Sequence, residues 1–310
     1  MNDAEERFAA RLGEDLERVL GELPGTCSVG ELVHLWQRGV LDDETCGCGE
    51  RFGHCPFWAE VGRRAFDGWE PGLAVRMLEL RRRVDRTRHV LLAAAPWLRR
   101  REREEYVGVF ARLYRAIAET SGCEVVIDSS KHSSLAFCLR GSADIDLRVL
   151  HVVRDSRGVA YSWTKQVVRP EAHGAEDLMT RYSPSRSAFL WTGHNLALTA
   201  LRRLGTSIRL LRYEDFVADP SGTLRDVAAF AGLPPESDPA EFLDGHTVEL
   251  TRSHTVAGNP VRFRTGSMTL RRDDDWRAQL PRRRRRLVTA LTLPLLVRYG
   301  YLGRSAERAA

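Results

Sequence analysis

The stretch Leu147-Arg-Val-Leu-His-Val-Val-Arg-Asp-Ser-Arg-Gly-Val-Ala-Tyr-Ser-Trp163 passes from an aliphatic, strand-like run into a helical pattern. Two similar runs, Glu124–Asp128 and Ser207–Tyr213, are each followed by polar residues and then by a helical pattern. Short apolar strands that alternate with helices indicate a parallel sheet covered on both faces. The sequence therefore predicts an α/β fold.

Three polar segments follow these strands. In a parallel sheet of this kind, ligands bind outside the carboxyl ends of the strands. This rule places along one rim the segments Asp128–His132, Arg154–Ser162 and Tyr213–Asp215. We expect the binding site at that rim.

The turn after Val153 is suited to an anion. The N-terminus of the following helix offers free N–H groups and the positive end of the helix dipole. Arg154 adds a bidentate donor and Ser162 a neutral one, and both suit a phosphate. A surface salt bridge between Arg154 and Asp155 is the alternative, but the whole string R-D-x-R-G-x-x-x-S at a strand-to-helix turn favours phosphate.

The segment His151–Trp163 resembles the 3′-phosphate-binding signature of the sulfotransferase superfamily, whose sulfuryl donor is 3′-phosphoadenosine 5′-phosphosulfate. The resemblance implies that Arg154 and Ser162 bind the 3′-phosphate of this co-substrate. Three further segments resemble the family in the same order. The first is Val126–Lys131, which resembles the family's strand and loop with a catalytic lysine. The second is Arg212–Phe216 with Asp219-Pro220, and the resemblance implies that Tyr213 lies near the adenine. The third resembles the loop that closes over the nucleotide and consists of Gly258–Gly266, which contains Arg262, Arg264 and Gly266, followed by Asp275-Trp276 and Tyr299–Tyr301.

The resemblance covers residues 123–301 and implies one sulfotransferase-like domain over residues 1–310. The implied fold is the P-loop-NTPase-like, three-layer sulfotransferase fold, in which helices flank a parallel sheet. Residues 39–120, a helical and cysteine-rich insertion, match none of the four motifs, and neither do residues 165–190. We expect both regions to shape the acceptor pocket.

The implied reaction is an in-line attack of an acceptor hydroxyl or amine on sulfur. It needs a base and a positive charge at the leaving oxygen, and it requires no metal. Lys131 is our candidate for the charge, because only Lys131 and Lys165 are lysines among the 47 lysines and arginines.

Glu31 is the preferred base. The stretch Leu23-Pro-Gly-Thr-Cys-Ser-Val-Gly-Glu31 resembles the one that supplies a glutamate base in protein-tyrosine and some carbohydrate sulfotransferases. Two alternatives stay open. Glu31 could instead start the following helix, where the dipole favours an acid, and His132 could act as the acid or base, since imidazole titrates near neutrality.

The front of the chain departs from the family pattern. The family's first strand is followed by a loop resembling G-x-x-R-S-G-T/S-T-L-L, which holds the 5′-phosphosulfate. At about residues 9–16 stands Ala-Ala-Arg-Leu-Gly-Glu-Asp-Leu, without hydroxyls and with two acids. Either the recorded start omits or replaces the first strand, or the protein is a degenerate member. Both explanations predict a sheet that lacks its central first strand.

Three of the six cysteines cluster in Cys46-Gly-Cys48-Gly-Glu-Arg-Phe-Gly-His54-Cys55. With His54 they could supply four zinc ligands, but the C-x-C spacing and the adjacent His-Cys pair differ from the usual zinc-finger pattern. The sequence favours a loop of reduced thiols over a metal site or a disulfide.

Bulk properties limit the partners. A net charge of +5 suits an anionic partner without naming it. Residues 282–286 are all arginine with no aromatic residues between them, which favours a solvated helix face over a nucleic-acid site. No apolar run is long enough to span a membrane and no secretory signal is evident, so we expect a cytoplasmic protein. The acceptor is expected to be a small molecule, glycan or lipid; the sequence leaves its identity and the oligomeric state open.

Overall fold

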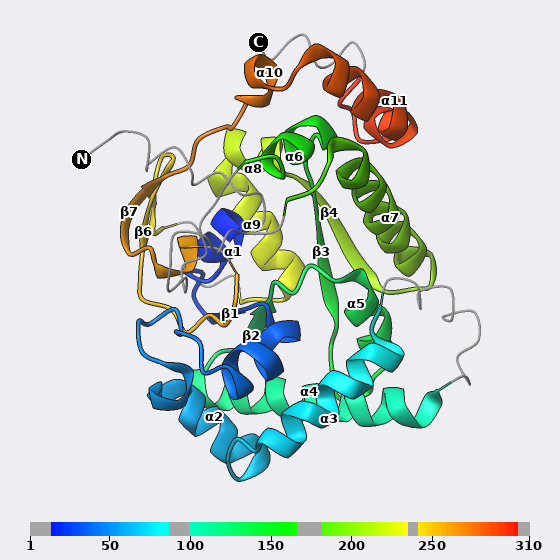
Figure 1. Ribbon diagram of the computed structural model, residues 1–310. Coiled ribbons are helices and arrows are strands. Elements are labelled where there is room, and N and C mark those ends of the chain that lie inside the picture. The colour runs from blue at the N-terminus through cyan, green and yellow to red at the C-terminus, as the bar shows by residue number, and fades with distance from the viewer. Residues whose placement is uncertain (1–13, 87–98, 166–180, 235–240, 259, 303–310) are drawn as a thin grey trace.

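The computed structural model describes residues 14–86, 99–165, 181–234, 241–258 and 260–302. All three predicted strands are present, as β2 (Val125–Asp128), β3 (Arg148–Val153) and β4 (Ser207–Arg212). Strand β1 (Thr26–Gly30) pairs with β2 in parallel, and β3 pairs with β4 in parallel. The predicted α/β class with parallel strands is confirmed (Figure 1).

The two parallel pairs form separate sheets in the described part of the chain, because β2 and β3 are not hydrogen-bonded to each other. Helix α1 (Glu14–Leu20) joins them: its apolar face shares one core cluster with Ile127 of β2 and Val152 of β3. Each apolar side chain buried there contributes about 1.5–3 kcal/mol. The family's phosphate loop is expected at about residues 9–16, so its last residues fall in this helix, and residues 1–13 lie outside the described residues.

The cysteine-rich and helical region forms its own core, seen at the bottom of Figure 1. Trp36, Trp58 and Phe110 are almost completely buried there, and Val29 of β1 belongs to the same cluster. The region is thereby attached to the first sheet, while its description as an insertion stays a prediction. Its elements are η2 (Leu32–His34), η3 (Leu35–Leu41), η4 (Phe52–His54), α2 (Pro56–Phe66), α3 (Pro71–Val84) and α4 (Arg100–Ser121).

A helix follows each of the strands β2, β3 and β4, as the sequence pattern predicts. These helices are α5 (Ser133–Leu139), α6 (Ser156–Ser162) and α8 (Tyr213–Ala218). The carboxyl ends of β3 and β4 therefore open at one rim, with α6 and α8 above them (Figure 1). The remaining helices are α7 (Pro184–Arg203), α9 (Pro220–Ala231), α10 (Trp276–Gln279) and α11 (Arg282–Arg298).

A small antiparallel sheet lies beside α1. It consists of β5 (Leu243–Asp244), β6 (Thr247–Leu250) and β7 (Gly266–Thr269), and η6 (Pro260–Phe263) lies between the last two. Its buried Val248 and Met268 pack in the same cluster as α1. The sheet thus fixes both ends of the segment between β6 and β7, which contains most of the motif expected to close over a nucleotide.

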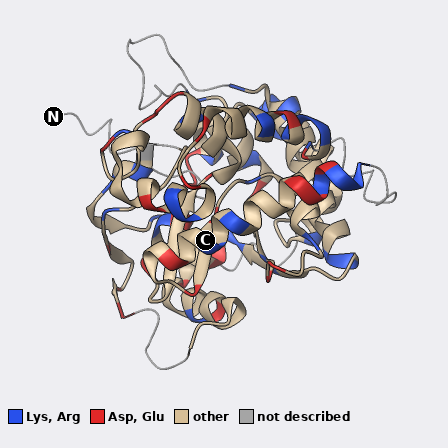
Figure 2. Ribbon diagram, turned by 90° about the horizontal axis from the view of Figure 1, so that it is seen from below, with Lys and Arg blue, Asp and Glu red and all other residues tan. Residues whose placement is uncertain are grey.

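The arginine run at the start of α11 is largely exposed, as expected for a solvated helix face. Figure 2 shows basic and acidic positions interspersed along the ribbon. No helix in the described ranges combines the length and the apolar character needed to cross a bilayer.

Candidate active site

The register of β1 and β2 brings the two sequence segments that follow them together. Gly30 is aligned with Asp128, so the chain after β1 and the chain after β2 leave the sheet side by side. The backbone N–H of Leu32 donates to Asp128 Oδ1 at 3.3 Å, and that of Val33 donates to Ser130 Oγ at 3.0 Å. These bonds fix Glu31 next to the loop that carries Lys131.

Asp128 organises this loop from the inside. Its Oδ2 accepts the Tyr114 hydroxyl at 2.7 Å, and its Oδ1 accepts the backbone N–H of Ser130 at 2.9 Å. Burial raises the pKa of the Asp128 carboxyl, while these donors oppose the rise. A buried carboxylate that receives several hydrogen bonds rigidifies its surroundings, so the loop at residues 129–132 has a firm base.

Glu31 and Lys131 are in direct contact. Lys131 Nζ donates to Glu31 Oε1 at 2.7 Å, and His34 Nε2 lies 3.5 Å from Glu31 Oε2. Burial alone would raise the pKa of Glu31, but the Lys131 ammonium, with help from His34 and Arg38, holds it below its ordinary value. Glu31 is therefore a carboxylate at neutral pH, the form that can accept a proton.

Lys131 occupies an unusual backbone conformation, with a φ of 59°. A left-handed conformation at a residue other than glycine costs on the order of 1–3 kcal/mol and is found most often at functional sites. The loop thus stores strain at the one residue whose ammonium reaches Glu31.

Three histidines lie at or beyond this pair: His34 beside Glu31, His132 next to Lys131 in the chain, and His194 beside Ser133. The rings of His34 and His132 meet edge to face at 6.0 Å, and His194 of α7 places Nδ1 3.2 Å from the hydroxyl of Ser133. Burial lowers the pKa of all three imidazoles, that of His34 to about 4. They are neutral at physiological pH, and the structure thus brings His132 into the same cluster as Glu31 and Lys131.

Arg154, at the end of β3, is buried, with 1% of its side chain exposed. Its guanidinium forms an ion pair with Asp273, with Nη2 3.0 Å from Oδ2, and also donates to the Asp273 carbonyl at 2.6 Å. The Lys165 ammonium lies 4.0 Å from the same carboxylate. Arg154, the expected phosphate ligand, and Lys165, which belongs to no predicted motif, therefore converge on one anionic group from the segment before α10.

The rest of the strand-to-helix turn is built as expected for a helix start. Asp155 caps α6, accepting the backbone N–H of Arg157 at 2.9 Å, and its carboxylate also pairs with the Arg157 guanidinium. The sequence left a salt bridge between Arg154 and Asp155 as an alternative. In the structure the Asp155 carboxylate forms an ion pair with Arg157, and Arg154 forms one with Asp273. Ser162 is the last residue of α6 and is half-buried.

Of the other expected nucleotide ligands, the structure places one, Tyr213, against Arg154. Tyr213 starts α8, is buried, and carries the Arg154 guanidinium 5.0 Å from its ring centre. Arg262 is buried in η6 and donates to the Thr255 carbonyl at 3.3 Å. Arg264 is exposed, and Gly266 begins β7 with a φ of 82°. The structure places Tyr213 beside Arg154. Nucleotide binding by Arg262, Arg264 and Gly266 stays a prediction.

Residues 9–13 of the expected 5′-phosphosulfate loop lie outside the described residues. Residues 14–16, the end of the expected loop, form the start of α1, and Glu17 of this helix accepts the hydroxyls of Ser28 at 2.7 Å and Ser129 at 2.5 Å. The helix is therefore bonded directly to β1 and to the loop of Lys131.

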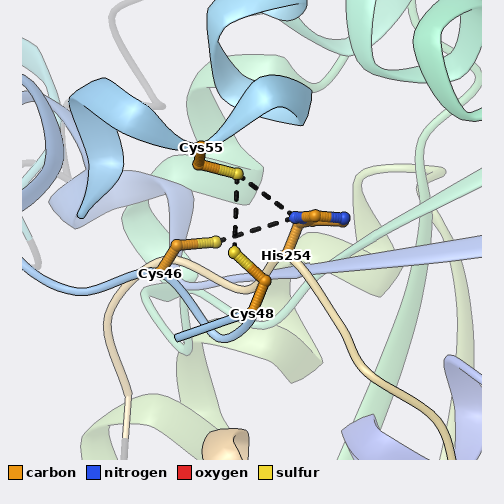
Figure 3. A group of neighbouring side chains, drawn as sticks. All are labelled: Cys46, Cys48, Cys55 and His254. Atoms are coloured by element: carbon orange, nitrogen blue, oxygen red, sulfur yellow. Dashed lines mark hydrogen bonds between the residues drawn. The ribbon is translucent and has the colours of Figure 1, made fainter. Parts of the chain in front are cut away.

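The histidine that joins the cysteine cluster is His254, not His54 as the sequence suggested. Figure 3 shows Cys46, Cys48 and Cys55 grouped around His254, while His54 is exposed and stands apart from the group. All six cysteines carry free thiols in the structure. His254 and Asp273 are the two important residues that sequence reasoning missed, because each is isolated in the sequence from the motif it joins.

Comparison with known proteins gave two matches. A family described as "Sulfotransferase domain" matches residues 75–288. Among solved structures, the chain is similar to "Sulfotransferase Domain from the Curacin Biosynthetic Pathway", with 18% identity and a TM-score of 0.45 over 91% of this chain and 93% of that one. Comparison with curated proteins gave no match.

Proposed function

The chain belongs to the sulfotransferase domain family, and from that premise we propose that it transfers a sulfuryl group from 3′-phosphoadenosine 5′-phosphosulfate to a hydroxyl or amine. The acceptor is proposed to be a small molecule, a glycan or a lipid. The observation that carries the proposal is the contact between the Glu31 carboxylate and the Lys131 ammonium at 2.7 Å.

In the proposed reaction, Glu31 accepts the proton of the acceptor group as its oxygen or nitrogen forms a bond to sulfur. The bond between sulfur and the bridging oxygen of the 5′-phosphate breaks at the same time. Lys131 stabilises the negative charge that develops on that oxygen. A positioned base is worth about 10²–10⁴-fold in rate, and a preorganised cation acts in the same transition state.

The nucleotide is proposed to bind at the end of β3. Arg154 and Lys165 already converge on the Asp273 carboxylate, which supports the end of β3 as an anion position. The 3′-phosphate would replace this carboxylate on Arg154, and Ser162 would add a hydroxyl donor. Tyr213, beside Arg154, supports an adenine position next to the phosphate.

A second candidate is a protein that binds the nucleotide without turnover. It is favoured by the sequence at residues 9–16, which lacks the hydroxyls that hold the 5′-phosphosulfate in the family and carries Glu14 and Asp15 instead. Two negative charges near a phosphosulfate would cost on the order of 1–4 kcal/mol each at about 4 Å.

One experiment separates the two. The full chain is titrated with adenosine 3′,5′-bisphosphate by calorimetry and incubated with radiolabelled donor and a broad acceptor panel. Binding together with transfer of label supports the enzyme. Binding without transfer to any acceptor supports the non-catalytic protein, and absence of binding by folded protein contradicts both.

A further inference from the structure

A compact group of soft ligands contains none of the candidate active-site residues. Cys46 and Cys48 stand on a tight turn, Cys55 caps the start of α2, and His254 comes from the segment after β6 (Figure 3). Their sulfur atoms and an imidazole nitrogen all lie within 4.8 Å of one another. Cys46 and Cys55 are fully buried, and Cys48 and His254 are half-buried.

The spacing of the four atoms is close to that of a tetrahedral metal site. Zinc–sulfur bonds of about 2.3 Å and zinc–nitrogen bonds of about 2.0–2.1 Å place neighbouring sulfurs about 3.8 Å apart and sulfur about 3.6 Å from nitrogen. Cys48 Sγ and Cys55 Sγ are 3.7 Å apart. His254 Nδ1 lies 3.2 Å from Cys55 Sγ and 3.9 Å from Cys46 Sγ.

The backbone of the first loop is shaped to present its two sulfurs. The N–H of Cys46 donates to the Glu50 carbonyl at 2.8 Å, and that of Gly49 donates to the Cys46 carbonyl at 2.9 Å. Gly49 has a φ of 95°, which glycine adopts without strain. These backbone bonds hold the turn, from which Cys46 Sγ contacts His254 Nδ1 and Cys48 Sγ contacts Cys55 Sγ.

The second segment is held against this turn by a close approach that requires glycine. A Cβ atom on Gly47 would lie 2.5 Å from Thr255 Oγ1, and the N–H of Gly47 donates to the Thr255 carbonyl at 3.0 Å. The chain thus brings His254 to the cysteines through its backbone.

The imidazole is also oriented from outside. The ring of Phe57 stacks on His254 with centres 4.7 Å apart and planes 13° from parallel, and Trp58 Nε1 donates to the His254 carbonyl at 2.9 Å. Metal sites use such surrounding contacts to fix the direction of their ligands.

We propose that Cys46, Cys48, Cys55 and His254 bind one Zn²⁺ ion. Three thiolates and one imidazole are a common structural zinc set, because zinc is borderline soft and accepts sulfur and nitrogen in a tetrahedron. With all four positions filled by the protein, no coordination site is left for a substrate. The ion therefore has a structural role.

The site fixes a segment that reaches Glu31. Two residues beyond His254, the N–H of Val256 donates to the Val29 carbonyl at 2.8 Å, and the N–H of Glu31 donates to the Val256 carbonyl at 2.9 Å. Zinc would clamp the 46–55 loop to this segment and so hold the backbone of Glu31 from one side. Zinc binding itself does not depend on the proposed reaction.

The test measures metal in the full chain, purified without a polyhistidine tag and dialysed after exposure to Zn²⁺ alone. Mass spectrometry of the metal is expected to give about one zinc per chain. His254→Gln should reduce the content at least about fivefold, whereas His54→Gln, the matched control on the adjacent histidine, should retain it. Wild-type protein with less than about 0.1 zinc per chain, or equal loss in both variants, overturns the proposal.

A second measurement applies if the variants fold poorly. Wild-type chain stripped with a chelator and titrated with Co²⁺ should show sulfur-to-cobalt charge-transfer absorption and the visible bands of tetrahedral cobalt. The intact mass of untreated protein is compared in parallel. A loss of two hydrogens, without metal, contradicts the zinc site if peptide mapping places the disulfide between two of Cys46, Cys48 and Cys55 and not between Cys27 and Cys123.

Discussion

Two ion pairs at the carboxyl ends of parallel strands differ sharply in their surroundings. The Lys131 side chain, paired with Glu31, is 45% exposed, whereas that of Arg154, paired with Asp273, is 1% exposed. Glu31 is 14% exposed, so the first pair, called the exposed pair after Lys131, has one member that water reaches and can part at lower cost than a fully buried pair. A buried pair is costly to break. In the proposed function, the first pair can part for a substrate at low cost, while the second must open before an anion can reach Arg154.

The largest expected effect is on the exposed pair. Glu31→Gln keeps the shape of the side chain and its contact with Lys131 but removes the proposed base, so the rate of transfer should fall about 10²–10⁴-fold. Affinity for adenosine 3′,5′-bisphosphate should stay unchanged. Glu60→Gln, which alters an exposed carboxylate bound to Arg63 and Arg64 on α2, is the control. A decrease of less than about threefold would show that Glu31 is not the base.

The next effect concerns the buried pair. Arg154→Met leaves the Asp273 carboxylate without its buried cation and should lower the free energy of unfolding by about 3–5 kcal/mol. Urea unfolding measures it. Arg148→Met, which removes a surface partner of Asp146, should cost no more than about 1 kcal/mol.

Arg154→Lys extends this test to the ligand. It keeps the positive charge but not the planar fork, so it should weaken binding of adenosine 3′,5′-bisphosphate more than it weakens folding. Equal binding by Arg154→Lys and the wild type would argue against a phosphate at this position.

The contrast between the two pairs also marks what the sequence could predict. Strands β2, β3 and β4 were predictable because each is a short local run of apolar residues, and their shared direction placed Lys131 and Arg154 at strand ends. Glu31 was found through the motif before it. Asp273 and His254 were not predictable, since their partners lie more than a hundred residues away and no local spacing connects them. The way α1 joins the two strand pairs was likewise not predictable, since it depends on contacts of this helix with residues distant in the sequence.

A pH dependence follows from His34, the half-buried neighbour of Glu31. Burial lowers the pKa of His34 from 6.5 to about 4. The neighbouring Glu31 carboxylate opposes this decrease, whereas Arg81, His132 and Arg38 lower the pKa further. Between these values the unfolded state binds more protons than the folded state. The resulting stability is complete above pH 6.5 and is lost as the pH falls toward 4. One pKa unit corresponds to about 1.4 kcal/mol, so acidification to about pH 5 should remove up to about 2 kcal/mol.

His34→Gln isolates this contribution. The free energy of unfolding of this variant, measured in urea at about pH 7 and about pH 5, should fall less on acidification than that of the wild type. His246→Gln is the control, because His246 is an exposed residue in the turn before β6. An equal decrease in His34→Gln and the wild type would mean that His34 is not held neutral by burial.

The smallest effect bears most directly on the difference between the two regions. If Asp273 occupies the place that a phosphate takes on Arg154, then Asp273→Asn removes a competing negative charge and should raise the affinity for adenosine 3′,5′-bisphosphate about tenfold, or about 1.4 kcal/mol. The same change leaves the Arg154 guanidinium less well compensated, so the unliganded protein should be less stable. Asp274→Asn, which alters the neighbouring carboxylate paired with Arg272 and Arg277, should change neither quantity. Calorimetry gives the affinity and urea unfolding the stability. A gain in affinity with a loss in stability is the signature of an internal carboxylate that competes with the ligand, whereas a loss in both would make Asp273 a support for Arg154.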